Sequence, residues 1–195
     1  MNAKTGKTYT TAVVLIPPED VWEPIQKLRR VYDRHFDRWM PHLTLLYPFA
    51  ERQEFPQVIP ILATATAKVE PFRLRLARFD HFRHQRSCTI FLLPDPESHV
   101  INLHASLIEA TPDYNDTTKY AGGFHPHLSI GQFQHQSVQQ DEQRLQSEWT
   151  PIQFEVKQIS VIYRAPETGE RFVVSETLTL GSAKTYAVPA LNKAK

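Results

Sequence analysis

Apolar residues recur along this chain with two different spacings. In some segments they alternate with polar residues or form short runs, as at 72–76, which is the pattern of a half-buried strand. In others they recur every three to four positions, as at Val21, Ile25, Leu28 and Tyr32, which is the pattern of an amphipathic helix. The spacings predict strands at 9–16, 42–49, 72–76, 88–93, from about 127, 152–164 and 171–180, and helices at 17–32, 55–68, 97–111 and 138–149.

The predicted elements follow one order twice: strand, helix, strand, helix, strand. Proline, aspartate and glycine clusters separate them, including a turn at 166–169 and a long connection at 111–124. For that connection, a mobile flap and a plain surface loop are both open. This order predicts an α+β fold. We therefore expect one domain over 1–181, built from two pseudo-symmetric lobes, and a tail without a clear pattern at 182–195.

One short string occurs in both predicted lobes. Residues 41–45 read Pro-His-Leu-Thr-Leu, and residues 126–130 read Pro-His-Leu-Ser-Ile. In a strand, side chains two positions apart point to the same face, so each histidine shares a face with its hydroxyl residue while the aliphatic residues point the other way. A single histidine in an apolar strand is more often structural. The recurrence favours a functional site, formed where the two strands meet across a cleft.

Composition limits the classes of function. The chain has 195 residues, 41% hydrophobic and 22% charged, with a net charge of +1. These values fit a globular protein and exclude an extended polybasic surface, so a nucleic-acid contact should be small, such as one nucleotide or an RNA end. Cys88 is the only cysteine, which excludes an internal disulfide and fits a reducing compartment. With no apolar stretch of membrane-spanning length, we expect a cytoplasmic monomer without a membrane or protein partner.

The two strings resemble the paired His-x-Thr/Ser-x signatures of the 2H phosphoesterase superfamily, which includes 2′-5′ RNA ligase-like proteins and cyclic phosphodiesterases. The resemblance covers about residues 8 to 180. It implies two antiparallel sheets flanked by helices around a central cleft, with lobes that exchange strands. It also implies that His42, Thr44, His127 and Ser129 are the catalytic residues, with serine in place of the second threonine.

Such a set of side chains suits hydrolysis of a 2′,3′-cyclic phosphate. The reaction needs a base for water, an acid for the leaving ribose oxygen, and donors for the phosphoryl oxygens. Two histidines and two hydroxyls supply these groups, so we expect no metal and no cofactor. We assign His127 as the base and His42 as the acid, which leaves a 2′-phosphate. The substrate would be a nucleotide or RNA terminus bearing a cyclic phosphate.

Other functions use the same residues. One is 2′-5′ RNA ligation, and another is action on a cyclic phosphate of the ADP-ribose type. A third is a binding module that holds a phosphate or nucleotide without turnover. Formation of a 2′-monophosphate from a 2′,3′-cyclic nucleotide separates an enzyme from a binding module.

Several residues near the strings are weaker candidates for substrate binding. Tyr47, Phe49 and Phe133 could stack on a base, although core packing suits at least two of them better. Arg164 ends a strand that we expect beside the second string, where it would either bind a phosphate or form a surface ion pair.

The remaining histidines have equally ordinary explanations. His125 and His127 have the spacing of a weak metal pair, without an obvious set of further ligands. His81 and His84 are expected in a solvated hairpin loop, where they could add positive charge near the substrate.

Overall fold

The computed structural model describes residues 6–119 and 122–181. The predicted tail at 182–195 lies outside the described residues. Within them, eight strands form one antiparallel sheet in the order β10-β9-β2-β3-β7-β6-β5-β8, and β1 pairs with β4. The elements are β1 Lys7–Thr8, β2 Thr11–Leu15, α1 Trp22–Tyr32, β3 Leu43–Leu46, β4 Phe49–Ala50, α2 Phe55–Thr66, β5 Phe72–Arg83, β6 Cys88–Asp95, α3 Glu97–Ala110, β7 Leu128–Phe133, α4 Val138–Glu148, β8 Ile152–Val156, β9 Gln158–Tyr163 and β10 Val173–Thr179, with short 3-10 turns between them.

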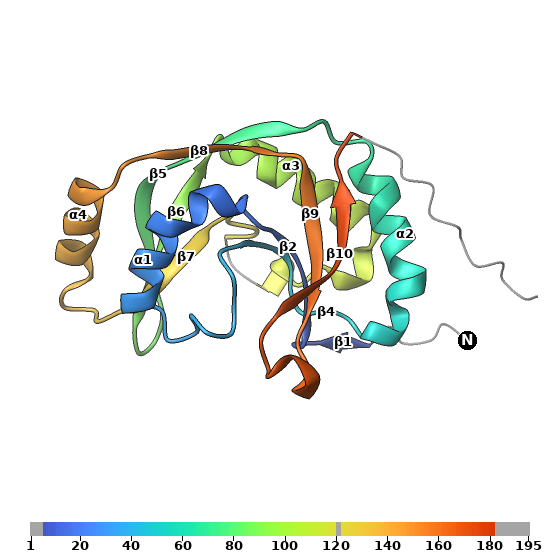
Figure 1. Cartoon of the computed structure of the whole chain (residues 1–195), viewed down its shortest axis with the longest axis horizontal. Helices are drawn as coiled ribbons and strands as arrows, with labels where there is room; N and C mark the ends of the chain where they lie inside the picture. Colours follow the sequence, from blue (N-terminus) through green and yellow to red (C-terminus); the bar gives the residue numbers. More distant parts are fainter. Residues whose placement is uncertain (1–5, 120–121, 182–195) are drawn as a thin grey trace, which may run out of the picture.

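The large sheet consists of two halves with a narrow connection. Strands β10, β9, β2 and β3 form one half, and strands β7, β6, β5 and β8 form the other. The halves are joined by the pairing of Leu43 in β3 with Leu128 in β7. Figure 1 shows the sheet curling around this connection, with β8 and β9 arching from one half to the other. The expected α+β fold of curled antiparallel sheets and helices is confirmed.

Helices cover both halves of the sheet. Helix α1 packs on β7, and α4 packs on β5 (Figure 1). Helices α2 and α3 pack against each other, α2 also against β10 and α3 also against β6. Between these layers lies a continuous apolar core, whose burial contributes about 25 cal/mol per Å². Its fully buried members include Ile25, Leu43, Leu62, Leu74, Ile90, Leu103 and Leu128.

The prediction for 152–164 as one strand beside the second string is wrong. The segment breaks at Lys157 into β8, which pairs with β5, and β9, which lies between β2 and β10. Four consecutive residues of β9, 159–162, are buried, and a strand with this pattern is stable where it has neighbours on both edges. Arg164 therefore follows a strand of the β2 half.

Two other predicted strands differ in length. The segment 42–49 divides into β3 and β4, separated by Tyr47 and Pro48. Strand β5 continues from the predicted 72–76 to Arg83, and a register shift between Leu76 and Arg78 bends it. The longer strand brings its hairpin turn close to the second string, which matters for the cavity described below.

Helix α1 approaches β7 at Gly131 without room for a side chain. A Cβ atom at Gly131 would lie 2.4 Å from the backbone oxygen and from the Cβ of Tyr32. We expect Gly131→Ala to push α1 from β7 and lower the free energy of unfolding by about 1–3 kcal/mol, measured by urea denaturation. The control is Gly6→Ala, whose Cβ would meet the movable Glu51 carboxylate, at 2.9 Å. Equal stability of the two variants would contradict the tight packing of α1.

Candidate active site

The structure brings the two His-containing strings together. Leu43 pairs with Leu128, and both side chains are fully buried on one face of the sheet. The partly buried histidine and hydroxyl side chains alternate with them and point to the other face. Continuing the antiparallel register by one residue puts Thr44 opposite His127 and His42 opposite Ser129.

Each string has the same shift of register at its last residue. In β3 the register with β2 shifts between Thr44 and Leu46, and in β7 the register with β6 shifts between Ser129 and Gly131. The residue after each hydroxyl residue therefore forms a β-bulge. Bulges bend a strand and redirect its side chains, and they are common beside active sites. The pseudo-symmetry of the site thus extends from residue types to backbone geometry.

Both histidine rings are held in one tautomer. Nδ1 of His42 lies 2.7 Å from the backbone oxygen of Met40, and Nδ1 of His127 lies 2.7 Å from the backbone oxygen of His125. A carbonyl oxygen can only accept a hydrogen bond, so Nδ1 carries the proton in each ring. Nε2 is then left to accept a proton from, or return one to, a substrate.

Aromatic side chains fix the planes of the two rings. The ring of His42 stacks on Trp39 at 4.6 Å, and Trp39 stacks in turn on Phe172 at 3.7 Å. The ring of His127 packs edge-on against Phe82, with centroids 4.9 Å apart. Sequence reasoning missed these aromatic residues, because Phe82 and Phe172 are distant from the strings in sequence and Trp39, although only three positions before His42, lies outside any predicted strand or helix.

Burial keeps both rings neutral. Burial lowers the pKa of His42 to about 4; the bond to Met40 opposes the shift, while the positive charge of Arg29 adds to it. Burial also lowers the pKa of His127; the hydrogen bond to the carbonyl of His125 opposes this shift, and the nearby rings of His125 and His84 add to it. A phosphate bound between the rings would favour protonation, because an anion stabilises the imidazolium form.

A cavity of about 620 Å³ opens beside the strings. This volume is within the range of pockets that hold small molecules. Three of the four predicted catalytic residues, Thr44, His127 and Ser129, line it, whereas His42 lies outside the lining and against Trp39. The other lining residues used here are Tyr47, Phe82, His84, Tyr114, Asp116 and Phe124.

The far wall of the cavity contains a second group of polar side chains that the sequence did not reveal. His104 of α3 stacks flat on Phe124, with centroids 3.8 Å apart. Its Nε2 is buried and has no hydrogen-bond partner within the described part of the chain, and burial lowers its pKa to about 4. Asp116 is held by Lys7 and Lys119, each at 2.8 Å. The connection at 111–124 therefore forms part of the cavity wall, and its role as a flap stays a prediction.

The expected substrate-binding residues are divided between the cavity and other places. Tyr47 lines the cavity. Phe49 is fully buried against Phe55 and Tyr114, and Phe133 is buried against Tyr32, so both belong to the core.

Arg164 is also away from the cavity. It pairs with Glu170 and lines a separate groove of about 370 Å³. The ion-pair alternative is thus the one that the structure favours, because Arg164 follows β9, which lies in the other half of the sheet from the second string.

The predicted hairpin histidines separate as well. His84 lines the cavity, where its Nε2 lies 3.1 Å from the hydroxyl of Thr89. His81 points to helix α4 and pairs with Glu142 at 2.6 Å. With Asp80 these two residues form a group whose ligand atoms lie within 4.8 Å of one another, outside the cavity lining.

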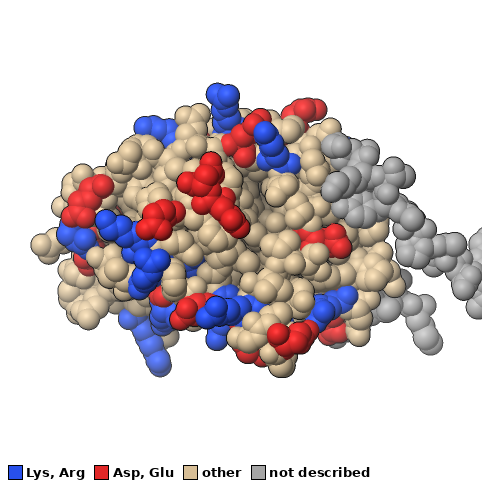
Figure 2. Space-filling model, viewed as in Figure 1, with Lys and Arg blue, Asp and Glu red and all other residues tan. Residues whose placement is uncertain are grey.

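Charges of both signs are mixed on the face shown in Figure 2, where lysine and arginine do not form a continuous stripe. This distribution agrees with the net charge of +1. Among the described residues, no helix combines the length and apolar character that crossing a bilayer requires.

Comparison with known proteins gives the family. Residues 17–168, which contain both strings, match the family described as the 2′-5′ RNA ligase superfamily. The chain belongs to this superfamily. The resemblance to 2H phosphoesterases expected from the paired strings is confirmed.

Individual members of the superfamily match nearly the full length of the chain. A protein of Halalkalibacterium halodurans named “Putative phosphoesterase” is 30% identical over 171 residues, which cover 87% of this chain and 96% of the relative. The apo structure of E. coli LigT has a TM-score of 0.60 at 16% identity, with 91% and 100% of the two chains covered. LigT complexed with 3′-AMP has a TM-score of 0.56 at 17% identity, with the same coverage. These structures share the fold of this superfamily member.

The lowered pKa of His104 predicts a pH-dependent stability. The unfolded chain binds a proton near pH 6.5 and the folded chain only near pH 4, so the free energy of unfolding falls as the pH decreases between these values. We expect His104→Leu to reduce this fall, measured by urea denaturation at several pH values. His99→Leu, an exposed site on the same helix, is the control and should keep the dependence of the wild type. An unchanged dependence in His104→Leu would contradict the buried neutral ring.

Proposed function

We propose that this protein hydrolyses a 2′,3′-cyclic phosphate, on a nucleotide or at an RNA end, to a 2′-phosphate. The observation that carries the proposal is that the rings of His42 and His127 have the same tautomer and the same hydrogen bond to the backbone. Each ring donates its Nδ1 proton to a backbone carbonyl at 2.7 Å and leaves Nε2 for the reaction. Two such rings on adjacent strands supply a base and an acid without further groups.

In the proposed reaction, water attacks the phosphorus and loses a proton to one imidazole. The bond from phosphorus to the ribose 3′ oxygen breaks, and the other imidazole, in its protonated form, gives that oxygen a proton. Thr44 and Ser129 donate hydrogen bonds to the two non-bridging oxygens, where negative charge increases. These four groups account for every proton transfer, so we propose that no metal is needed.

The charges around His42 favour an order of roles opposite to the one expected from the sequence. Arg29 is permanently charged and disfavours the protonated form of His42, whereas the neighbours that lower the pKa of His127 are themselves histidines. A neutral ring suits a base, and a ring whose protonated form is stabilised by the bound phosphate anion suits an acid. We therefore propose His42 as the base and His127 as the acid.

A small substrate fits the proposed site best. The cavity of about 620 Å³ can enclose a nucleotide, and the mixed charges on the face in Figure 2, with a net charge of only +1, favour a short contact over a long RNA backbone. LigT, which shares the fold, has been crystallised with 3′-AMP. We also propose that the protein works as a monomer in the cytoplasm, where its single buried cysteine stays reduced.

Ligation is the second candidate, because the family description names 2′-5′ RNA ligase. A 5′ hydroxyl would then replace water as the attacking group, and the same two rings would move the same protons. Product analysis with and without an RNA carrying a free 5′ hydroxyl distinguishes the two reactions.

We expect the purified protein to convert 2′,3′-cyclic nucleotides to 2′-monophosphates in the presence of EDTA. Chromatography of the reaction mixture measures the product. Loss of either histidine, in His42→Ala or His127→Ala, should lower kcat about 10²- to 10⁴-fold. Thr44→Ala and Ser129→Ala should each lower it about 10- to 100-fold, since one neutral hydrogen bond is lost. Tight nucleotide binding without any product would instead indicate a binding module.

The assignment of acid and base predicts a dependence on the leaving group. A p-nitrophenyl phosphodiester does not need an acid, because p-nitrophenolate is a stable leaving group. We expect His127→Ala to keep activity on this ester within about tenfold of the wild type while losing the cyclic nucleotide. His42→Ala should lose both activities. The opposite pattern would restore the sequence-based order, with His127 as the base.

A further inference from the structure

A buried ion pair lies behind the two histidines. Arg29 of helix α1 and Asp33, which follows the last residue of this helix, have side chains that are 2% and 5% exposed, and their closest atoms are 2.7 Å apart. Nε and Nη2 of Arg29 both donate to Oδ2 of Asp33, and Nη1 donates to Gln26. Replacing a buried ion pair by apolar residues is often neutral or stabilising, so burial of this pair is weak evidence for a role in stability alone.

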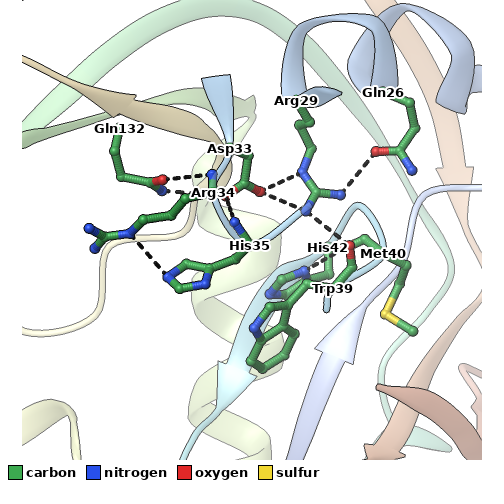
Figure 3. Close-up of polar contacts among 9 residues, drawn as sticks. All are labelled: Gln26, Arg29, Asp33, Arg34, His35, Trp39, Met40, His42 and Gln132. Carbon is green, nitrogen blue, oxygen red and sulfur yellow. Dashed lines mark hydrogen bonds and ion pairs between the residues drawn. The ribbon is translucent and has the colours of Figure 1, made fainter. Parts of the chain in front are cut away.

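The arginine reaches out of its helix to the segment that carries His42. Nη2 donates to the backbone oxygen of Trp39 at 3.0 Å (Figure 3). This oxygen belongs to the peptide between Trp39 and Met40. The next backbone oxygen, that of Met40, accepts the Nδ1 proton of His42, and the indole of Trp39 stacks on the same ring. Arg29 therefore binds the backbone of the two residues, Trp39 and Met40, that supply the groups orienting His42.

The aspartate reaches in the other direction, to the strand that carries His127 and Ser129. Its Oδ1 accepts a hydrogen bond from Nε2 of Gln132 in β7 at 3.4 Å. Gln132 also accepts, through Oε1, the backbone N–H of Arg34 at 3.1 Å. Figure 3 shows these contacts continuing from Gln132 through Asp33 and Arg29 toward His42.

The geometry points to Arg29 and Asp33 as positioning residues that hold the His42 segment against β7 and so fix the relation between the two reacting imidazoles. The sheet itself joins the two strings by only the Leu43–Leu128 pairing. The ion pair adds a second connection, made of side chains, between the same two segments. A shift of about 1 Å in a reacting group can reduce a rate about 100-fold, which gives this connection a catalytic consequence. The inference rests on the proposed phosphodiester reaction at this site.

The position of the pair also affects the charge of His42. The charged groups that face this ring are Arg29 of α1 and Asp33 just after this helix, and the other titratable group is His127, just before β7. Arg29 lowers the pKa of His42 and Asp33 raises it, and the effect of Arg29 is the larger of the two. Removing only the positive charge should therefore make His42 easier to protonate.

The test compares Arg29→Met and Arg29→Lys with Lys27→Met, which removes a positive charge from the exposed face of the same helix. We expect Arg29→Met to lower kcat for a 2′,3′-cyclic nucleotide about tenfold or more, with KM changed less than about threefold. The pKa of His42, followed by NMR of its ring, should rise in Arg29→Met and stay low in Arg29→Lys. Lys27→Met should match the wild type in both measurements.

A milder pair of variants covers the case in which Arg29→Met does not fold. Gln132→Leu removes the link to β7 without changing any charge, and Gln134→Leu is its exposed control just after the strand. We expect a lower kcat in Gln132→Leu with the pKa of His42 unchanged. Equal kcat in Gln132→Leu and Gln134→Leu would overturn the positioning role, as would equal kcat and equal His42 titration in folded Arg29→Met and Lys27→Met.

Failure of the proposed function gives a different result. In that case the wild type itself forms no 2′-phosphate, whereas the NMR titrations of His42 in the wild type, Arg29→Met and Lys27→Met still compare the arginine with its control. An identical His42 titration in these three proteins would then overturn the link from Arg29 to the ring.

Discussion

The pairing of β3 with β7 determines which polar side chains lie together beside the cavity. It joins the halves of the sheet through Leu43 and Leu128, and it places a histidine and a hydroxyl residue from each half on the same face. Because side chains alternate strictly along a strand, slipping one of these strands by one residue would turn its histidine and its hydroxyl residue into the core. Burial of the leucines opposes such a slip, since the leucine of the slipped strand would be exposed to water. Burial of the aliphatic side chains of the two strings thus determines the face of the sheet to which their polar side chains point.

The two strings resemble each other in hydrogen bonding and backbone geometry as well as in sequence. Each histidine gives its Nδ1 proton to the carbonyl two residues before it, and each hydroxyl residue precedes a bulge. The surroundings then differ: His42 has a stacked indole and a buried cation nearby, whereas His127 has phenylalanine rings and further histidines. A reaction that needs one base and one acid requires this combination of equal geometry and unequal charge.

Local patterns explain how much could be predicted from the sequence. The strings, the helices and the α+β class follow from alternation and helical spacing within short windows, and the paired strings also indicated the family. Pairing partners do not follow from such windows. Nothing in residues 152–164 alone shows that Lys157 separates strands of different halves, so Arg164 was expected in the wrong place. Likewise Phe49 lies close to a string in sequence but in the core, and no local pattern shows that Trp39 stacks on His42 or that Arg29 binds the Trp39 carbonyl.

The break at Lys157 also has a consequence for how the molecule is made. Strand β8 completes one half of the sheet, and β9 covers the edge of β2 in the other, so the last segments of the chain contribute to both. During synthesis, a ribosome-bound chain lacking these strands would leave backbone groups of β2 and β5 without partners, a state open to intermolecular association. Cutting the gene at the connection between the repeats would not yield two autonomous units. The two halves of the sheet are thus interlocked, and each obtains its last strands only after the carboxyl-terminal segments have left the ribosome.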